Sequence, residues 1–216
     1  MKKLFTLSIC LILEAFSTSR PNIILVMSDD HGYGDCGFTG HPFVQTPHLD
    51  DMAKSGVVFN RFYASAPVCS PTRASVLTGR HPFRVNVPNH GHYLRPHETT
   101  IAEKLKEAGY LTGHFGKWHI GSVQPDSPTS PGGAGFDEWL SGLNFFDNNP
   151  FLSRNGNFEQ IEGSGTVITM DATLAFLEKY PQCPQPLFIV TWFPSPHASL
   201  RDVPQDMPIA SYLSND

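Results

Sequence analysis

Four short polar clusters along the chain contain side chains that can bind metals, hold anions or transfer protons. Carboxylates suit hard metal ions, a thiol can act as a nucleophile, cationic side chains bind oxyanions, and imidazoles move protons near neutral pH. If the fold brings these groups together, they make a catalytic or binding centre. The clusters are Asp29 with Asp30, Cys69 with Arg73, Lys117 with His119, and His197 alone.

Asp29 and Asp30 directly follow the apolar run NIILVMS. Two adjacent carboxylates repel each other, and each binds a proton more readily unless a cation relieves the repulsion. Oxygen ligands of this kind favour a divalent ion, Ca²⁺ or Mg²⁺. The alternative is that one acid caps a turn and the other is solvated, since such acids are common in loops.

Cys69 begins the sequence CSPTR at the expected start of a helix. Ser70 is the expected N-cap, Pro71 stands in the first turn, and Gly79 follows the last turn. A helix N-terminus presents N–H groups to an anion, and Arg73 lies about one turn further on, so both can hold an anion beside Cys69. The alternative is an ordinary half-buried cysteine in a capped helix.

The imidazole clusters are weaker signals. Lys117 and His119 lie two residues apart on one side of an extended segment, and His197 stands between prolines, where it can equally be a solvated loop residue. Three further histidines occur in NHGHYLRPH, but no expected element makes them converge on a metal. We expect that segment to face a substrate or to be plain surface.

The elements that must position these clusters alternate between strands and helices. Such alternation predicts an α/β fold with a largely parallel sheet sandwiched between helices. The segment 121–157 is rich in Gly, Pro, Ser and Asn, and we expect it to be a long surface excursion. Expected strands cover 22–28 (buried on both faces), 57–65, 110–115 and 187–193, and expected helices cover 47–56, 70–79, 100–109 and 166–180.

Three of the clusters follow expected strands. Asp29 and Asp30 follow the first, Lys117 and His119 follow the strand that ends near Gly116, and His197 follows LFIVTWF. In an open α/β sheet, ligands bind beyond the carboxyl ends of the strands. If the strands are parallel, the three clusters converge on one edge of the sheet.

Composition and the N-terminus limit the class of protein. The chain has 216 residues, of which 40% are hydrophobic, so it can bury a core, and its net charge of −5 argues against a nucleic-acid partner. Residues 1–17 have a basic start, an apolar run and a small-x-small end, which predicts a signal peptide and no permanent membrane span. We expect a secreted or periplasmic protein in which Cys36, Cys69 and Cys183 form no disulfide scaffold.

These motifs together resemble the type I sulfatases of the alkaline-phosphatase-like superfamily. The signature is PVCSPTRASVLTG at residues 67–79, a second block is GYLTGHFGKWH at residues 109–119, and RPNIILVMSDDHGYGD at residues 20–35 resembles the family's opening strand and metal-binding acids. The likeness extends over essentially the whole mature chain, in family order. It implies a sulfuric ester hydrolase that cleaves sulfate esters, with sulfated glycans as candidate substrates.

The resemblance also implies a cofactor chemistry. In the family, a separate maturation enzyme oxidises the motif cysteine to formylglycine, whose hydrated aldehyde supplies the nucleophile. Carried onto this sequence, that cysteine is Cys69. Asp29 and Asp30 would bind Ca²⁺ together with the modified residue 69, and the ion would neutralise sulfate oxygens.

The remaining clusters take roles by the same resemblance. Arg73 and Lys117 would stabilise the oxyanion. His119 would assist deprotonation of the hemiacetal hydroxyl, and His197 would bind sulfate or protonate the leaving oxygen.

The chain departs from the family in length. Family members are longer and have a later Asp-Asn pair that completes the Ca²⁺ site, as well as a further Lys that contacts sulfate. The pair Asp147-Asn148 precedes the His197 strand and does not match that position. We therefore expect 18–216 to be the N-terminal part of a sulfatase catalytic domain, with a sheet that is incomplete at the C-terminus. The alternatives are a phosphate or phosphonate ester hydrolase of the same superfamily and a truncated, non-catalytic remnant.

Overall fold

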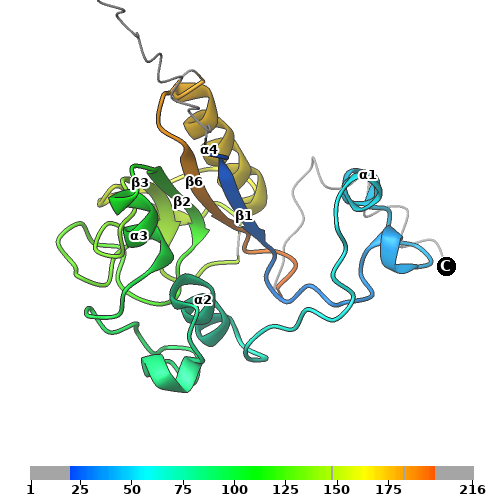
Figure 1. Cartoon of the computed structure of the whole chain (residues 1–216), viewed down its shortest axis with the longest axis horizontal. Helices are drawn as coiled ribbons and strands as arrows, with labels where there is room; N and C mark the ends of the chain where they lie inside the picture. Colours follow the sequence, from blue (N-terminus) through cyan, green and yellow to red (C-terminus); the bar gives the residue numbers. More distant parts are fainter. Residues whose placement is uncertain (1–19, 147, 182, 198–216) are drawn as a thin grey trace, which may run out of the picture.

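A six-stranded sheet lies at the centre of the molecule (Figure 1). The computed structural model describes residues 20–146, 148–181 and 183–197. The strand order is β1-β6-β2-β3-β4-β5, in which the first four strands are parallel and the last two antiparallel. The strands are β1 (Ile23–Met27), β2 (Leu111–Lys117), β3 (Glu138–Gly142), β4 (Phe151–Arg154), β5 (Asn157–Gln160) and β6 (Leu187–Trp192).

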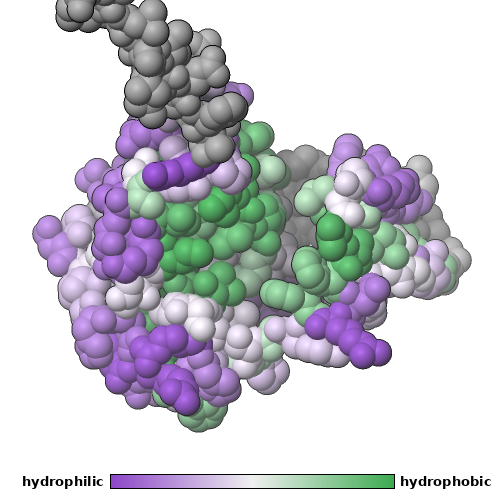
Figure 2. Space-filling view, in the orientation of Figure 1, coloured by the Kyte–Doolittle hydropathy of each residue, from purple (hydrophilic) through white to green (hydrophobic). Residues whose placement is uncertain are grey.

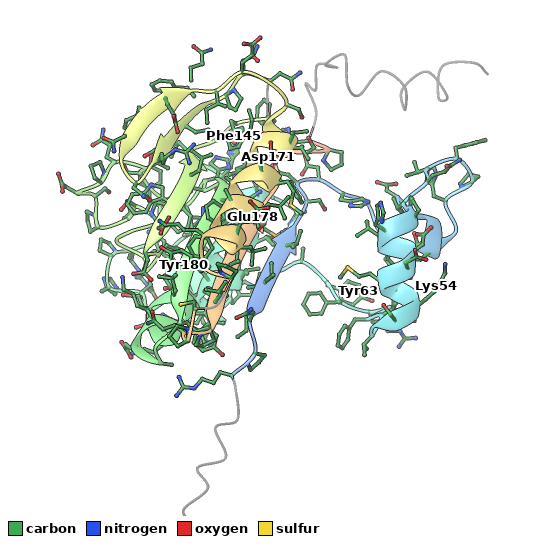
Figure 3. The ribbon with its side chains drawn as sticks, turned by 90° about the horizontal axis from the view of Figure 1, so that it is seen from above. Lys54, Tyr63, Phe145, Asp171, Glu178 and Tyr180 are labelled. Carbon is green, nitrogen blue, oxygen red and sulfur yellow. The ribbon has the colours of Figure 1, made fainter. Side chains whose placement is uncertain are left out.

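Helices cover both faces of the sheet, as the sequence predicts. The central strand β6 shows why, because Phe188 and Val190 pack into the core below α2 and α3, whereas Leu187 and Ile189 pack into the core below α4. Figure 3 shows α4 lying along one face of the sheet, while α1, which carries Lys54, stands to one side with Tyr63 nearby. The helices are α1 (Pro47–Ser55), α2 (Cys69–Thr78), α3 (Ile101–Glu107) and α4 (Gly165–Lys179), with short 3-10 turns η1 (Gly37–Thr39) and η2 (Pro82–Val85).

Local sequence signals explain most of these elements. The helix α3 begins with the expected capping box, in which Glu103 N donates to Thr100 Oγ1 over 3.1 Å and Thr100 N donates to Glu103 Oε2 over 2.7 Å. All six residues of β6 are buried, as its continuous apolar run predicts. The expected strand at 110–115 and the expected helices at 47–56 and 166–180 are also confirmed as β2, α1 and α4.

The first strand is correctly placed but was wrongly expected to be buried on both faces. Its exposure alternates, and Ile24 and Val26 are 45% and 61% exposed. The cause is position, because β1 is an edge strand and α4, which covers this face of the sheet, packs mainly on β2 and β6. Figure 2 shows the resulting apolar surface in the middle of the view, and a second apolar area around α1.

The strand expected at 57–65 is wrong. These residues form an extended, turn-rich segment without a strand, and Phe59, Phe62 and Tyr63 are exposed. Their β-branched and aromatic composition favours a strand, but β structure needs a partner, and none of the described strands lies beside them.

The surface excursion expected at 121–157 is also wrong in part, because it contains β3, β4 and the whole two-residue turn that leads into β5. Asn155 and Gly156 join β4 to β5 with φ angles of 50° and 92°, as a two-residue hairpin requires. The sequence signal that indicates this hairpin is the dipeptide Asn-Gly between two short strands.

Two expectations concern residues outside the described ranges: the signal peptide at 1–17 and the pair that begins with Asp147. Among the described residues, no helix is both long and apolar enough to cross a bilayer.

Candidate active site

The four polar clusters meet at the carboxyl ends of three parallel strands. Asp29 and Asp30 follow β1, Lys117 ends β2, and His197 follows β6, while the start of α2 lies against the same edge. The backbone N–H of Asp29 donates to Ser195 O over 3.0 Å, which fixes the two loops after β1 and β6 to each other.

Asp29 forms the centre of a buried charge cluster. Its carboxylate is 4% exposed, Lys117 Nζ donates to Oδ2 over 2.6 Å, and Arg73 Nη2 lies 3.4 Å from Oδ1. Lys117 and Arg73 are themselves 0% and 1% exposed. Two cations therefore face one carboxylate, and the cluster carries a net positive charge that favours an anion.

Arg73 is held by several contacts at once. Its Nη1 donates to the carbonyl of Lys117 over 2.8 Å, and its guanidinium lies 4.9 Å from the ring centroid of Trp192. Burial lowers the pKa of Arg73 and the charge of Asp29 opposes that effect, yet a guanidinium remains charged at neutral pH.

Cys69 and His119 form the second pair. Cys69 Sγ lies 3.1 Å from His119 Nδ1, although the residues are 50 positions apart. Cys69 is the first residue of α2, and Val68 is the N-cap, so the expectation that Ser70 caps this helix is wrong. The Ser70 hydroxyl instead donates to the carbonyl of His119 over 2.6 Å and ties the two segments together.

Gly116 directly precedes Lys117 and adopts a backbone conformation that only glycine fits at this position. Its φ is +105°, and a Cβ there would lie 1.9 Å from the carbonyl oxygen of Trp192. His119 also takes a positive φ of 53°, which turns its ring toward Cys69.

The pKa of His119 is lowered to about 4. Burial is the main cause, and the positive charges of Lys117, Arg73 and His90 add to it. The ring is therefore neutral at physiological pH, and Nδ1 can accept a proton from the group at position 69.

Asp30 and His197 form the outer part of the site. His197 Nε2 lies 3.5 Å from Asp30 Oδ2, and their side chains are 26% and 56% exposed. Asp30 has a φ of 62°, which marks a constrained turn after β1.

Phe146 is a residue that the sequence reasoning missed. Its ring stacks on His197 with centroids 4.4 Å apart and an interplanar angle of 5°, and Lys117 Nζ lies 5.6 Å from its centroid. Phe146 lies in a polar loop. The only sequence signal was that it directly follows another aromatic residue, Phe145, and such a pair indicates a loop that packs against the rest of the protein.

His114 is a second missed residue, directly under the site. It is fully buried among the rings of Trp118, Phe136 and Trp192, and its Nδ1 lies 2.7 Å from Ser141 Oγ. Burial and the charge of Arg73 lower its pKa well below the ordinary value. The available signal was a histidine within a segment that the sequence predicts to be a strand.

A cavity of about 460 Å³ opens between the loop after β1 and the start of α2. Its lining includes Asp29, Asp30, Cys69 and Arg73. A tetrahedral anion that enters this cavity meets the thiol and the guanidinium together.

The fit of a Ca²⁺ ion is partial. Asp29 and Asp30 supply hard oxygens beside Cys69, but Asp29 already faces Lys117 and Arg73. No group of three or more acidic, histidine or cysteine ligands occurs among the described residues, whereas Ca²⁺ takes six to eight oxygens. The described residues therefore supply only part of such a site.

The mostly parallel sheet, the helices on both of its faces and the polar site beyond its strand ends are the architecture that the resemblance to the alkaline-phosphatase-like α/β class predicts. The family model described as Sulfatase matches residues 21–212. The chain belongs to the sulfatase family.

Two curated relatives show the extent of the similarity. Arylsulfatase A of Bos taurus is 42% identical over 146 residues, which cover 65% of this chain and 29% of the relative. N-acetylgalactosamine-6-sulfatase of Mus musculus is 39% identical over 154 residues, with the same two shares. The chain thus spans less than a third of the length of these relatives.

Solved structures cover more of the chain. The crystal structure of Ps i-CgsB in complex with k-i-k-neocarrahexaose superposes with a TM-score of 0.81 at 30% identity, over 91% of this chain and 49% of that one. The structure of BT4656 in complex with its substrate D-glucosamine-2-N,6-O-disulfate superposes with a TM-score of 0.78 at 29% identity, over 89% of this chain and 38% of that one.

Proposed function

We propose that residues 18–216 are the N-terminal part of the catalytic domain of an exported sulfatase whose nucleophile is formylglycine made from Cys69. The observation that carries the proposal is the contact of 3.1 Å between Cys69 Sγ and His119 Nδ1, where Cys69 and Arg73 line one cavity. Sulfatase family membership supports it. The basic and apolar start of residues 1–17 supports export to the periplasm or the exterior.

Formylglycine supplies a hydrated aldehyde, of which one oxygen attacks sulfur and the other allows sulfate to leave as the aldehyde is restored. His119 serves this chemistry as a base. Its neutral Nδ1 lies against the atom at position 69 and takes up the proton that the hydroxyl releases.

Arg73 and Lys117 supply positive charge to the sulfate oxygens. Both are buried and fixed by Asp29, so they are oriented before substrate binds. Preorganised charges in a site with little water stabilise a developing anion more strongly than mobile surface charges do.

His197 lies on the outer side of the site, where an alcohol would leave. Its ring is stacked on Phe146 and its Nε2 faces Asp30. In this position it binds sulfate or gives a proton to the departing oxygen, so that the alcohol leaves neutral.

Ca²⁺ is the proposed metal, held by Asp29, Asp30 and the modified residue 69 together with ligands beyond the described residues. When bound, the ion would neutralise charge on the sulfate.

The proposed substrate is a sulfate ester on a carbohydrate. The two similar structures are complexes with k-i-k-neocarrahexaose and with D-glucosamine-2-N,6-O-disulfate, which supports this class. The proposed partner is the enzyme that converts Cys69 to formylglycine.

The test is hydrolysis of an aryl sulfate by the chain coexpressed with a formylglycine-generating enzyme. Turnover is expected, with loss of all activity in Cys69→Ala and retention in Cys183→Ala. Activity that persists in Cys69→Ala contradicts the nucleophile. A faster reaction with an aryl phosphate favours the phosphatase alternative, and no turnover after conversion of Cys69 favours the non-catalytic remnant.

A further inference from the structure

A strongly basic segment lies outside the site. Residues 80–97 contain no aspartate or glutamate, although the chain as a whole has a net charge of −5. Such local reversal of charge on an acidic protein creates a positive field over one part of the surface. The basic residues are Arg80, Arg84, Arg95, His81, His90, His92 and His97.

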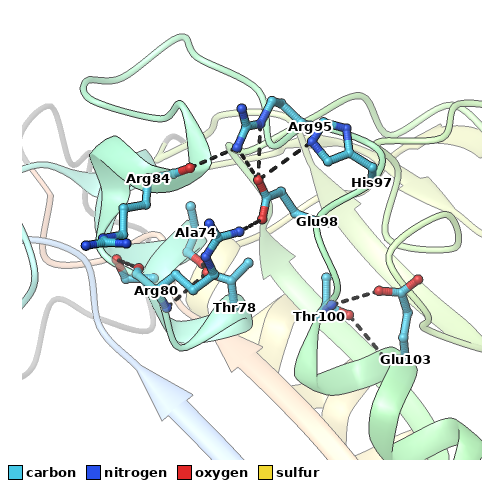
Figure 4. Close-up of polar contacts among 10 residues, drawn as sticks. Ala74, Thr78, Arg80, Arg84, Arg95, His97, Glu98, Thr100 and Glu103 are labelled. Atoms are coloured by element: carbon cyan, nitrogen blue, oxygen red, sulfur yellow. Dashed lines mark hydrogen bonds and ion pairs between the residues drawn. The ribbon is translucent and has the colours of Figure 1, made fainter.

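Part of this segment lines a pocket of about 790 Å³ between the end of α2 and the start of α3. Figure 4 shows its polar contacts. The pocket is distinct from the cavity at Cys69, because the two share no lining residue. Its ionisable lining residues are Arg80, Arg95, His97, Glu98 and Lys104.

Glu98 holds the two arginines in place. Its side chain is 3% exposed and accepts hydrogen bonds from Arg80 Nη1 and from Arg95 Nε and Nη2, the Nε contact being 3.1 Å. Arg95 Nη2 also donates to the carbonyl of Arg84 over 2.8 Å. These contacts fix both guanidiniums before a ligand binds, which reduces the conformational entropy that their side chains lose on binding.

The pocket keeps unneutralised positive charge. Arg80 and Arg95 share the single carboxylate of Glu98, and their side chains remain 48% and 39% exposed. Lys104 pairs with Glu107 at the surface. Arg84 does not line the pocket, but its carbonyl accepts the hydrogen bond from Arg95, and its exposed side chain forms no ion pair with any described residue.

The pocket lies within reach of the proposed catalytic site. The helix α2 connects them, with Cys69 at its first residue and Gly79 at its C-cap, so ten residues separate the two sites by about 15 Å along the axis. His90, in the same basic segment, adds to the positive field at His119. The basic segment that borders the pocket therefore also has a residue close enough to His119 to act on it electrostatically.

We propose that this pocket is an anion subsite that binds a second sulfate or carboxylate group of a polyanionic glycan whose reacting sulfate lies at Cys69. Guanidinium groups bind such oxyanions through two parallel hydrogen bonds. The inference rests on the proposed function for the nature of the ligand, but binding at the pocket needs neither formylglycine nor metal.

The test is binding of fluorescently labelled heparin, a sulfated glycan, to the full chain over a series of salt concentrations. The double variant Arg84→Gln/Lys104→Gln removes two exposed charges without touching the Glu98 contacts. We expect its affinity to fall about 3- to 10-fold, as screened surface charges allow, and its salt dependence to weaken.

The matched control is Lys54→Gln/Lys179→Gln, which removes the same charge from α1 and α4 and should bind heparin like the parent. Equal losses in the two double variants overturn the subsite, because they show only a net-charge effect. Tighter binding of single-stranded DNA than of heparin at equal charge overturns the glycan assignment.

Activity separates this inference from the proposed function. Turnover of a small aryl sulfate should be unchanged in Arg84→Gln/Lys104→Gln, and Cys69→Ala should keep heparin binding. Unchanged heparin binding in the pocket variant, with intact turnover, sinks the subsite alone. Absent turnover with the expected heparin result sinks only the proposed chemistry.

Discussion

Lys117 Nζ and Asp29 Oδ2 lie 2.6 Å apart in the interior, although 88 positions separate the two residues in the sequence. The pair joins the carboxyl ends of β1 and β2 across β6, which lies between them in the sheet. Because Arg73 faces the other oxygen of Asp29, one carboxylate holds both cations of the site in position.

Loss of this carboxylate should destabilise the protein strongly. Asp29→Asn leaves Lys117 and Arg73 buried without a counter-charge, and we expect a loss of about 3–5 kcal/mol in the free energy of unfolding. Urea denaturation measures it.

The double variant Asp29→Asn/Lys117→Met removes one of the stranded cations as well. It should lose less than the sum of the two single variants. A single-variant loss below about 1 kcal/mol, the level of an exposed pair, is incompatible with this account.

Gly116 should tolerate no side chain. Gly116→Ala places a Cβ 1.9 Å from Trp192 O at a φ of +105°, and we expect a loss of at least about 2 kcal/mol, from strain and displacement of β6. Gly79→Ala is the control, because Gly79 has a φ of +65° but no atom within 4 Å of the added Cβ. It should cost about 1 kcal/mol, the strain of the left-handed conformation alone. Equal losses in thermal unfolding argue against the contact.

His114 should make stability depend on pH. Its pKa in the folded protein is well below the ordinary value of 6.5, so below pH 6.5 the unfolded chain binds a proton that the folded chain does not. The stability that neutral His114 contributes is therefore fully present above pH 6.5. As the pH falls below this value, the free energy of unfolding decreases by up to about 1.4 kcal/mol per pH unit.

His114→Leu removes this titration. Urea denaturation at pH 7.5 and 5.5 should show a smaller difference between the two pH values in the variant than in the parent. An unchanged difference means that His114 is not the buried neutral group described.

Ca²⁺ should bind weakly to this chain. The described residues offer Asp30 and a carboxylate of Asp29 that already faces two cations, so we expect a dissociation constant at or above about 10⁻⁴ to 10⁻³ M. Calorimetric titration measures it, and Asp30→Asn should weaken binding further. A dissociation constant in the micromolar range would contradict the inference that the described residues supply only part of a Ca²⁺ site.

The sequence predicted those parts of the fold that local patterns encode. The capping box at Thr100 was sufficient to predict the start of α3, and the apolar run of β6 was sufficient to predict a buried strand. Both patterns depend only on residues that are neighbours in the chain. The exposure of Ile24 and the absence of a strand around Phe59 were not predictable, since both depend on which elements lie beside them in space. A run of apolar residues has the same appearance at the edge and at the centre of a sheet.

The candidate site shows the same limit. The order of the strands explains why the acids after β1 meet Lys117 at the end of β2, and parallel topology was enough to expect this. The contacts of Phe146 with His197 and of His114 with Trp192 arise from side-chain packing between distant segments. No spacing in the sequence indicates either contact.

The mass of the tryptic peptide that spans Phe62–Arg73 tests the central claim most directly, after expression in a host that makes formylglycine. We predict a peptide about 18 Da lighter than the sequence mass, as conversion of the Cys69 thiol to an aldehyde requires. A peptide at the full sequence mass, with a thiol at Cys69 that iodoacetamide alkylates, would contradict the proposed chemistry.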